Sequence, residues 1–297
     1  MEIKQDGARQ EKLRNVLLLL VRLGLWGDRE EHNTRLNLTE EDWNDVFRLA
    51  MQHTVTGLAF QGVSHLPDSQ IPPQSLLVRW MAETDAVERR NKRMNGVLGQ
   101  LYNIFHEKGL NPILQKGQGV ANYYESPLLR VCGDIDLYFN NKKAWDDALD
   151  FLRKNNITFT KQADEGISYR WQGVDIEHHS RLFDLYNPFL QGFVGKLEGQ
   201  KGYRHTALST YPSVIVTTPS PFLDILLQSL HILKHSVSRG IGLRQMCDMA
   251  RSCYKLHGEI DSEEMKAVCK KIGLHRWCPL LHTFLIDYLG LPKDCLP

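Results

Sequence analysis

Apolar residues in the first hundred positions recur with the period of an α-helix. Between residues 11 and 26 they fall on one helical face, formed by Leu13, Val16, Leu17, Leu20 and Leu23. Thr39, followed three positions later by Asp42, resembles a capping box at the start of a second helix. A long helix is predicted from Ser75 to Glu107, and its charged middle, residues 83–93, is expected to face solvent.

After this helical region the pattern changes to short strands separated by turns and helices. Strands are predicted at 111–114, 131–139, 157–160, 168–171, 174–178 and 214–217, and helices at 120–124, 141–155 and 222–235. We therefore expect an α+β fold with a small mixed-sheet core at 96–218. An N-terminal helical region at 1–95 and a C-terminal helical region at 219–297 are expected to flank it.

Two aspartates in the strand predicted at 131–139 are the first candidate for chemistry. Asp134 and Asp136 are two residues apart, so both side chains lie on the same face of a strand. Two adjacent carboxylates repel each other unless a cation lies between them, and Mg²⁺ prefers such oxygen ligands. A third acid from a neighbouring strand would complete the site, and both Glu177 and Asp175 are candidates.

A glycine-containing turn precedes these acids at the end of the strand predicted at 111–114. Its sequence, Leu114-Gln115-Lys116-Gly117-Gln118-Gly119, leads into a helix and exposes backbone N–H groups that suit phosphate. Lys116 adds a positive charge, and Gly133, next to the acids, allows a ligand to approach the backbone. The turn is not a Walker A loop, because no Gly-Lys-Ser or Gly-Lys-Thr occurs in it.

Taken together, these segments resemble the uncharacterised nucleotidyltransferase family of the polymerase-β-like nucleotidyltransferase superfamily. The similarity covers roughly residues 95–255. The motifs that carry it are Lys116-Gly117, Ala121-x-Tyr123-Tyr124, Arg130-x-x-Gly133-Asp134-Ile135-Asp136-Leu137, Glu177-His178-His179 and Gly242-Leu243-Arg244-x-x-x-Asp248. The superfamily usually has Gly-Ser or Gly-Gly at the turn, and this chain departs from that pattern with Lys116-Gly117.

The resemblance implies transfer of a nucleoside monophosphate from a nucleoside triphosphate, with ATP expected, to a hydroxyl of a small molecule or protein. It implies Mg²⁺ or Mn²⁺ held by Asp134, Asp136 and Glu177, which are also the expected catalytic residues. The expected nucleotide-binding residues are Lys116, Gly117, Arg130 and Gly133. The residues expected to line the acceptor or nucleotide site are His179, His231, His235 and Arg244.

Two other functions remain open at this point. The first is a nucleotide-binding module that has lost catalysis, against which the acids Asp134, Asp136 and Glu177 argue. The second is a metal hydrolase that uses His231, His235 and Asp248, with the two histidines four residues apart on a helix. Cys269, His275, Cys278 and His282 have irregular spacing and are expected to belong to packed helices rather than to a zinc site.

Composition indicates which classes of partner and which location to expect. Lys and Arg total 36 against 35 Asp and Glu, a net charge of +1, so nucleic acid is not an expected partner. None of the six cysteines forms a Cys-x-x-Cys pair, which favours free thiols and a cytoplasmic location. The most apolar stretch, residues 16–21, is too short to cross a bilayer, so no membrane partner is expected.

Overall fold

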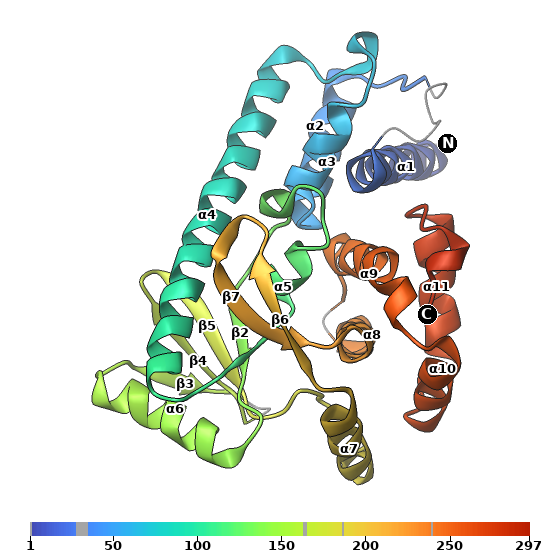
Figure 1. Ribbon diagram of the computed structural model, residues 1–297. Helices are drawn as coiled ribbons and strands as arrows, with labels where there is room; N and C mark the ends of the chain where they lie inside the picture. Colours follow the sequence, from blue (N-terminus) through green and yellow to red (C-terminus); the bar gives the residue numbers. More distant parts are fainter. Residues whose placement is uncertain (1, 28–34, 163–164, 186, 239) are drawn as a thin grey trace.

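The computed structural model describes residues 2–27, 35–162, 165–185, 187–238 and 240–297 (Figure 1). Helices dominate its N-terminal part. They are α1 (Glu2–Trp26), α2 (Glu40–Gln52), α3 (Thr56–Val63) and α4 (Gln74–Glu107). The capping box predicted at the start of α2 is present, with Thr39 and Asp42 bonded reciprocally. The region is therefore helical, as its periodicity predicts.

Helix α3 is absent from the sequence-based prediction, and its position explains why. Its sequence is short and glycine-rich, which weakens a helical pattern. In the structure α3 lies against α1 at a close backbone crossing. A Cβ atom at Gly62 would lie 1.9 Å from the carbonyl oxygen of Leu20, and one at Gly24 would lie 2.1 Å from that of Leu58. The two glycines are there to allow this crossing, which only the tertiary structure reveals.

The centre of the molecule is a mixed sheet with the strand order β3-β4-β5-β2-β1-β7-β6. Its strands are β1 (Ile113–Gln115), β2 (Ile135–Tyr138), β3 (Phe159–Lys161), β4 (Ile167–Trp171), β5 (Val174–His179), β6 (Tyr203–Leu208) and β7 (Tyr211–Pro219). The pairs β2–β5 and β1–β7 are parallel, and the other neighbouring pairs are antiparallel. The expected α+β class with a mixed-sheet core is confirmed.

Helices of the core and of the C-terminal part surround this sheet. They are α5 (Gly117–Ala121), α6 (Lys142–Lys154), α7 (Gln191–Lys201), α8 (Pro221–Ser238), α9 (Leu243–Leu256), α10 (Ser262–Lys271) and α11 (Trp277–Asp287). Short 3-10 helices occur at Asp68–Gln70, Pro127–Leu129, Pro188–Leu190, His257–Glu259 and Lys293–Cys295. Both α7 and β6 are absent from the sequence-based prediction. Buried and exposed positions alternate imperfectly in β6, which is one of the two edge strands of the sheet, so its apolar pattern is weak.

The long helix α4 joins the helical and sheet parts of the molecule. Along its 34 residues it passes from the N-terminal helices to the sheet, which it borders in Figure 1. Its Trp80 packs among the N-terminal helices, whereas Leu98 and Phe105 pack with the strands and α6. The boundary expected near residue 95 therefore falls inside one continuous helix.

Two hydrophobic cores result from this arrangement. One lies between the sheet, the C-terminal half of α4 and α6. The other is shared by the N-terminal helices and the C-terminal helices α8–α11, which lie on the same side of the molecule in Figure 1. Buried Arg251 of α9 donates to the carbonyl of Leu25 at 2.7 Å, and Trp26 donates to that of Leu289. The two ends of the chain thus fold against each other.

Two expectations from composition can be compared with the described residues. All six cysteines are free thiols, as expected. Within the described ranges, no helix has both the length and the apolar character needed to cross a membrane.

Candidate active site

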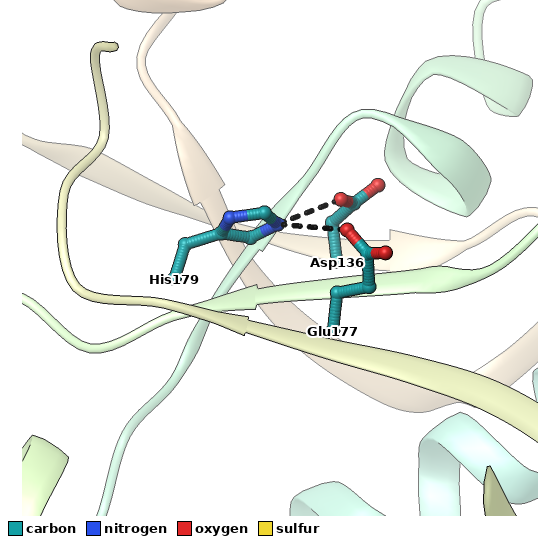
Figure 2. Close-up of side chains that lie close together, drawn as sticks. All are labelled: Asp136, Glu177 and His179. Atoms are coloured by element: carbon teal, nitrogen blue, oxygen red, sulfur yellow. Dashed lines mark hydrogen bonds and ion pairs between the residues drawn. The ribbon is translucent and has the colours of Figure 1, made fainter. Parts of the chain in front are cut away.

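The parallel pairing of β2 with β5 brings the predicted acids together. Asp136 lies directly opposite Glu177 in the register. Along β5, Val174, Ile176 and His178 are buried, so Glu177 and His179 occupy the opposite face. Figure 2 shows the resulting cluster: Nε2 of His179 lies 2.8 Å from Oδ1 of Asp136 and 3.7 Å from Oε2 of Glu177.

Asp134 enters the same site from the residue just before β2. Burial, together with the nearby charge of Asp136, raises the pKa of Asp134 to about 6. Burial also acts on Asp136, but Lys116 and His179 outweigh it and hold the pKa of Asp136 well below its usual value. The repulsion expected between the two aspartates therefore changes mainly the pKa of Asp134, while Asp136 is stabilised as a carboxylate.

The glycine turn lies beside these acids, because β1 pairs antiparallel with β2 and Gln115 stands opposite Asp136. Lys116 has a φ of +47°, which is unusual for a residue other than glycine. This conformation places its ammonium group 3.4 Å from Oδ1 of Asp136. At Gly117, with a φ of +48°, a Cβ atom would lie 3.6 Å from the carbonyl oxygen of Asp134. The turn and the acids thus form one unit.

A cavity of about 810 Å³ opens above this unit. Every residue that the family resemblance assigns to the site lines it. They are Lys116, Gly117, Arg130, Gly133, Asp134, Asp136, Glu177, His179, His231, His235 and Arg244. The cavity is rich in charge of both signs, which suits a polyanionic ligand with a cation better than an apolar one. It lies between the sheet and the helices α8 and α9.

Arg130, expected to bind the nucleotide, has a buried carboxylate partner. Its buried guanidinium donates to both carboxylate oxygens of Asp248, at 2.7 Å each, and the hydroxyl of Tyr124 donates to the same aspartate. This bidentate pair fixes α9 against the segment that leads into β2. Arg130 thus lines the cavity with its charge matched by Asp248, and its contact with the nucleotide stays a prediction.

The histidines of α8 line the cavity opposite the acids. The rings of His231 and His235 are 4.4 Å apart. Burial and the neighbouring cations lower the pKa of His231 to about 2, so its ring is neutral at physiological pH. Arg244 lines the same wall and donates to the carbonyl of Val131 at 2.9 Å. Since Asp248 is held by Arg130 and Tyr124, the set His231, His235 and Asp248 does not form a metal centre.

The structure also separates the two candidates for the third acid. Glu177 lines the cavity, whereas Asp175 is exposed and lies 3.7 Å from Arg170. Among the described residues, Asp136, Glu177 and His179 are the only group of three or more potential ligands whose donor atoms lie within 4.8 Å of one another. Cys269 and Cys278 approach to 3.7 Å between their sulfur atoms, and no other histidine, cysteine or acid among the described residues forms a ligand group with them.

Several residues of the site carry no recognisable signal in the sequence. Gln162, which follows β3, donates to Oε1 of Glu177 at 2.8 Å. Gln228 and Lys234 of α8 and Gln245 of α9 also line the cavity. An amide side chain near a strand end has no spacing rule that relates it to a distant glutamate. Only the pairing of β3, β4 and β5 places Gln162 there.

Three comparisons with known proteins bear on this arrangement. No curated protein matches the chain. Among solved structures, an antigenic nucleotidyltransferase-like protein from Paracoccidioides brasiliensis is similar, with 15% sequence identity and a TM-score of 0.42. The match covers 67% of this chain and 92% of that one. A family model described as an uncharacterised nucleotidyltransferase matches residues 39–286, further in both directions than the motifs alone indicate. The chain therefore belongs to this uncharacterised nucleotidyltransferase family.

Proposed function

We propose that this protein transfers a nucleoside monophosphate from a nucleoside triphosphate, with ATP expected, to a hydroxyl group of an acceptor. Membership of the family supports nucleotidyl transfer in general. The observation that carries the finer proposal is the register of β2 and β5, which sets Asp136 opposite Glu177 beside the Lys116-Gly117 turn. An inactive nucleotide-binding module would have no need for this set of acids.

A divalent cation fits the donor set. Asp136 and Glu177 offer carboxylate oxygens that converge with the imidazole of His179, and Asp134 lines the same cavity. We assign Asp134, Asp136 and Glu177 as the residues that would hold Mg²⁺ or Mn²⁺. A bound ion would supply charge neutralisation at the phosphates and orientation of the hydroxyl. Carboxylate oxygens suit both Mg²⁺ and Mn²⁺.

The residues of the chain then act as follows. Lys116 and Arg244, on the cavity wall, balance the negative charge of the triphosphate. The acceptor hydroxyl attacks the α-phosphorus, the bond to the bridging oxygen of the β-phosphate breaks, and pyrophosphate leaves. The hydroxyl proton passes to a carboxylate of the site. His179 orients Asp136 through the 2.8 Å contact.

The direct test is incubation of the purified protein with each α-labelled nucleoside triphosphate, a cell extract, and either Mg²⁺ or Mn²⁺. We expect label to move to an acceptor and pyrophosphate to be released, with both lost in chelator and in Glu177→Gln. Lys116→Ala should raise the KM for the nucleotide about tenfold, because one charged contact is lost. The exposed Lys142→Ala serves as a matched control.

Two results would contradict the proposal. Release of inorganic phosphate or free nucleoside monophosphate without any labelled acceptor would indicate hydrolysis. Nucleotide binding with no turnover under any metal, and no difference between the wild type and Glu177→Gln, would indicate an inactive module.

A further inference from the structure

Beside the catalytic cavity lies a second hollow, a groove of about 470 Å³ between α4 and the β4–β5 hairpin. We call it the arginine groove. Its lining residues with charged side chains are Arg89, Arg90, Arg93, Arg170 and Asp175. Four arginines therefore line one hollow, although the whole chain has a net charge of only +1. Arg89 pairs with Asp85, and Arg170 lies 3.7 Å from Asp175, so the remaining positive charge is that of Arg90 and Arg93. Such local concentration of one sign of charge attracts anions.

The arginines are held in place by backbone carbonyls. Arg90 donates to the carbonyl of Gly133 at 2.8 Å, and Arg170 donates to that of Gly173 at 3.4 Å. Arg93 donates to the carbonyl of Gln172 and lies so close to the hairpin that a Cβ atom at Gly173 would be 2.6 Å from its Nη2. Within the described part of the chain, no carboxylate lies within 4.0 Å of the guanidinium of Arg90 or Arg93. Among the described residues, neither charge is therefore paired with a carboxylate.

The geometry of the hairpin explains this arrangement. Gln172 and Gly173 both have positive φ, as the two central residues of a tight type I′ hairpin turn require. In the β4–β5 register Arg170 stands opposite Asp175, two residues before Glu177. By the period of two, Asp175 and Glu177 occupy the same face of β5. Arg170 and Asp175 of the groove thus lie on the face of the sheet that carries the catalytic acids.

The groove and the catalytic cavity meet at Gly133, which lines both. Gly133 immediately precedes Asp134, and a Cβ atom there would meet nothing within 4 Å, so the junction is open. The cationic side chains of the catalytic cavity are Lys116, Arg130, Lys234 and Arg244, and none of them lines the groove. The cavity and the groove therefore have separate sets of cations.

We infer that the arginine groove binds a phosphate group of the acceptor, so that the substrate receiving the nucleotide is a phosphorylated small molecule. This inference rests on the proposed function, because it assigns the second substrate of the same reaction. Guanidinium groups bind phosphate through paired N–H donors, and Arg93 and Arg170 converge on one hollow. The near-zero net charge and the size of the groove favour a small phosphate ester over a nucleic acid.

The first experiment measures anion binding without catalysis. Inorganic phosphate is titrated calorimetrically into the protein saturated with Mg²⁺ and α,β-methylene-ATP, at an ionic strength matched with chloride. We expect binding that weakens about tenfold in Arg93→Gln and in Arg170→Gln, since each removes a charge-assisted contact. Lys92→Gln is the matched control, because Lys92 lies on the same helix, pairs with Glu88 and does not line the groove.

Equal phosphate binding in the wild type and both groove variants, or no binding above the chloride background, would overturn the inference. Thermal melting of each variant shows whether its fold is retained, and Arg170, 71% exposed, can be replaced with the least disturbance of packing. Failure of α,β-methylene-ATP to bind would count against the proposed function instead. The phosphate titration still reports on the groove in that case, because its result is the difference between variants.

The second experiment identifies the acceptor class. A small-molecule extract is divided, one half is treated with phosphatase that is then removed, and both halves are used in the labelled transfer assay. Loss of the labelled product after phosphatase treatment, and a raised KM for the extract in Arg93→Gln with the KM for the nucleotide unchanged, are expected. Undiminished labelling of the treated half, or label appearing in polynucleotide, would overturn the inference.

Discussion

At the scale of single residues, the site depends on the protonation and contacts of its carboxylates. Lys116 and His179 stabilise Asp136 as an anion, whereas burial and the adjacent charge of Asp136 raise the pKa of Asp134. The spacing of the two aspartates predicts shared repulsion. The structure shows an unequal division, because only Asp136 has a cation and an imidazole within contact distance.

The first prediction is that Asp136→Asn abolishes transfer but preserves the fold. The amide has nearly the same shape as the carboxylate, so packing hardly changes. Nucleotidyl transfer should fall by roughly three orders of magnitude, because several kcal/mol of charge stabilisation at the phosphates is lost. The melting temperature in chelator should fall by only a few degrees, since Lys116 and His179 then contact a neutral amide instead of a carboxylate. The assay combines initial rates with thermal melting.

The matched control for this variant is Asp147→Asn, an exposed carboxylate that pairs with Lys143 on α6. It should leave both rate and melting temperature unchanged. If Asp136→Asn lowered the melting temperature strongly and kept its transfer rate, Asp136 would be a structural acid and its assignment to the cation would be wrong.

At the scale of elements, the start of α2 shows how a local motif is reinforced by tertiary contacts. Asp42 completes the capping box with Thr39 and also accepts from Arg9 and Lys12 of α1, both at 3.0 Å. Burial would raise the pKa of this carboxyl, but the bonds from Lys12 and from the backbone of Thr39 outweigh it and lower the pKa. The ionised form of Asp42 therefore stabilises the packing of α2 on α1.

We predict that Asp42→Asn destabilises the protein by about 1 kcal/mol at pH 7, the usual size of a lost capping contact. Because the pKa of Asp42 is lower in the folded than in the unfolded state, its stabilisation is complete above the unfolded value of about 3.9. It is lost as the pH falls through the folded value. Urea unfolding at pH 7 and near pH 2 should show the difference between variant and wild type disappear in acid.

Glu41→Gln provides the control for this series, because Glu41 belongs to the same turn but is 79% exposed and lies 3.6 Å from Arg9. It should change stability by only a few tenths of a kcal/mol. A difference between Asp42→Asn and the wild type that stays constant from pH 7 to pH 2 would show that the charge of Asp42 has no role.

At the scale of the whole molecule, the two ends of the chain share a hydrophobic core, and Arg251 connects them. This side chain is 1% exposed, donates to the carbonyls of Leu25 and Tyr123, and lies 5.1 Å from the ring centroid of Trp26. The division into N-terminal helices, sheet core and C-terminal helices stays a prediction. The contacts indicate that the two helical regions unfold together.

We predict that Arg251→Met lowers the free energy of unfolding by roughly 3 kcal/mol or more, because buried carbonyls lose their donors. For a chain of this length, this corresponds to a fall of about 10 °C in Tm. Unfolding should remain a single transition when it is followed by circular dichroism and by tryptophan fluorescence. The exposed Arg153→Met on α6 is the control and should melt with the wild type.

Separate unfolding of the N-terminal and the C-terminal helical regions in Arg251→Met would contradict a shared core. That outcome would instead support three independently folding regions with boundaries near residues 95 and 218.

The sequence alone determined much of this protein because many of its signals are local. A period of two places Asp134 and Asp136 on one face, a period of 3.6 gives α4 and α8, and the capping box marks the start of α2. These patterns depend only on backbone geometry over a few residues. The family motifs add information over longer stretches of sequence, since they relate the Lys116-Gly117 turn to the acids that follow it.

Only the tertiary structure decided which distant residues meet. The parallel register of β2 and β5 places Glu177, rather than Asp175, opposite Asp136. The pairing of Arg130 with Asp248, the approach of Gln162 to Glu177, and the closure of α1 against α9 join residues far apart in sequence. No periodicity specifies such pairs, because they depend on how complete elements pack. The arginine groove is of the same kind, since its cations come from one helix and one hairpin that only the fold brings together.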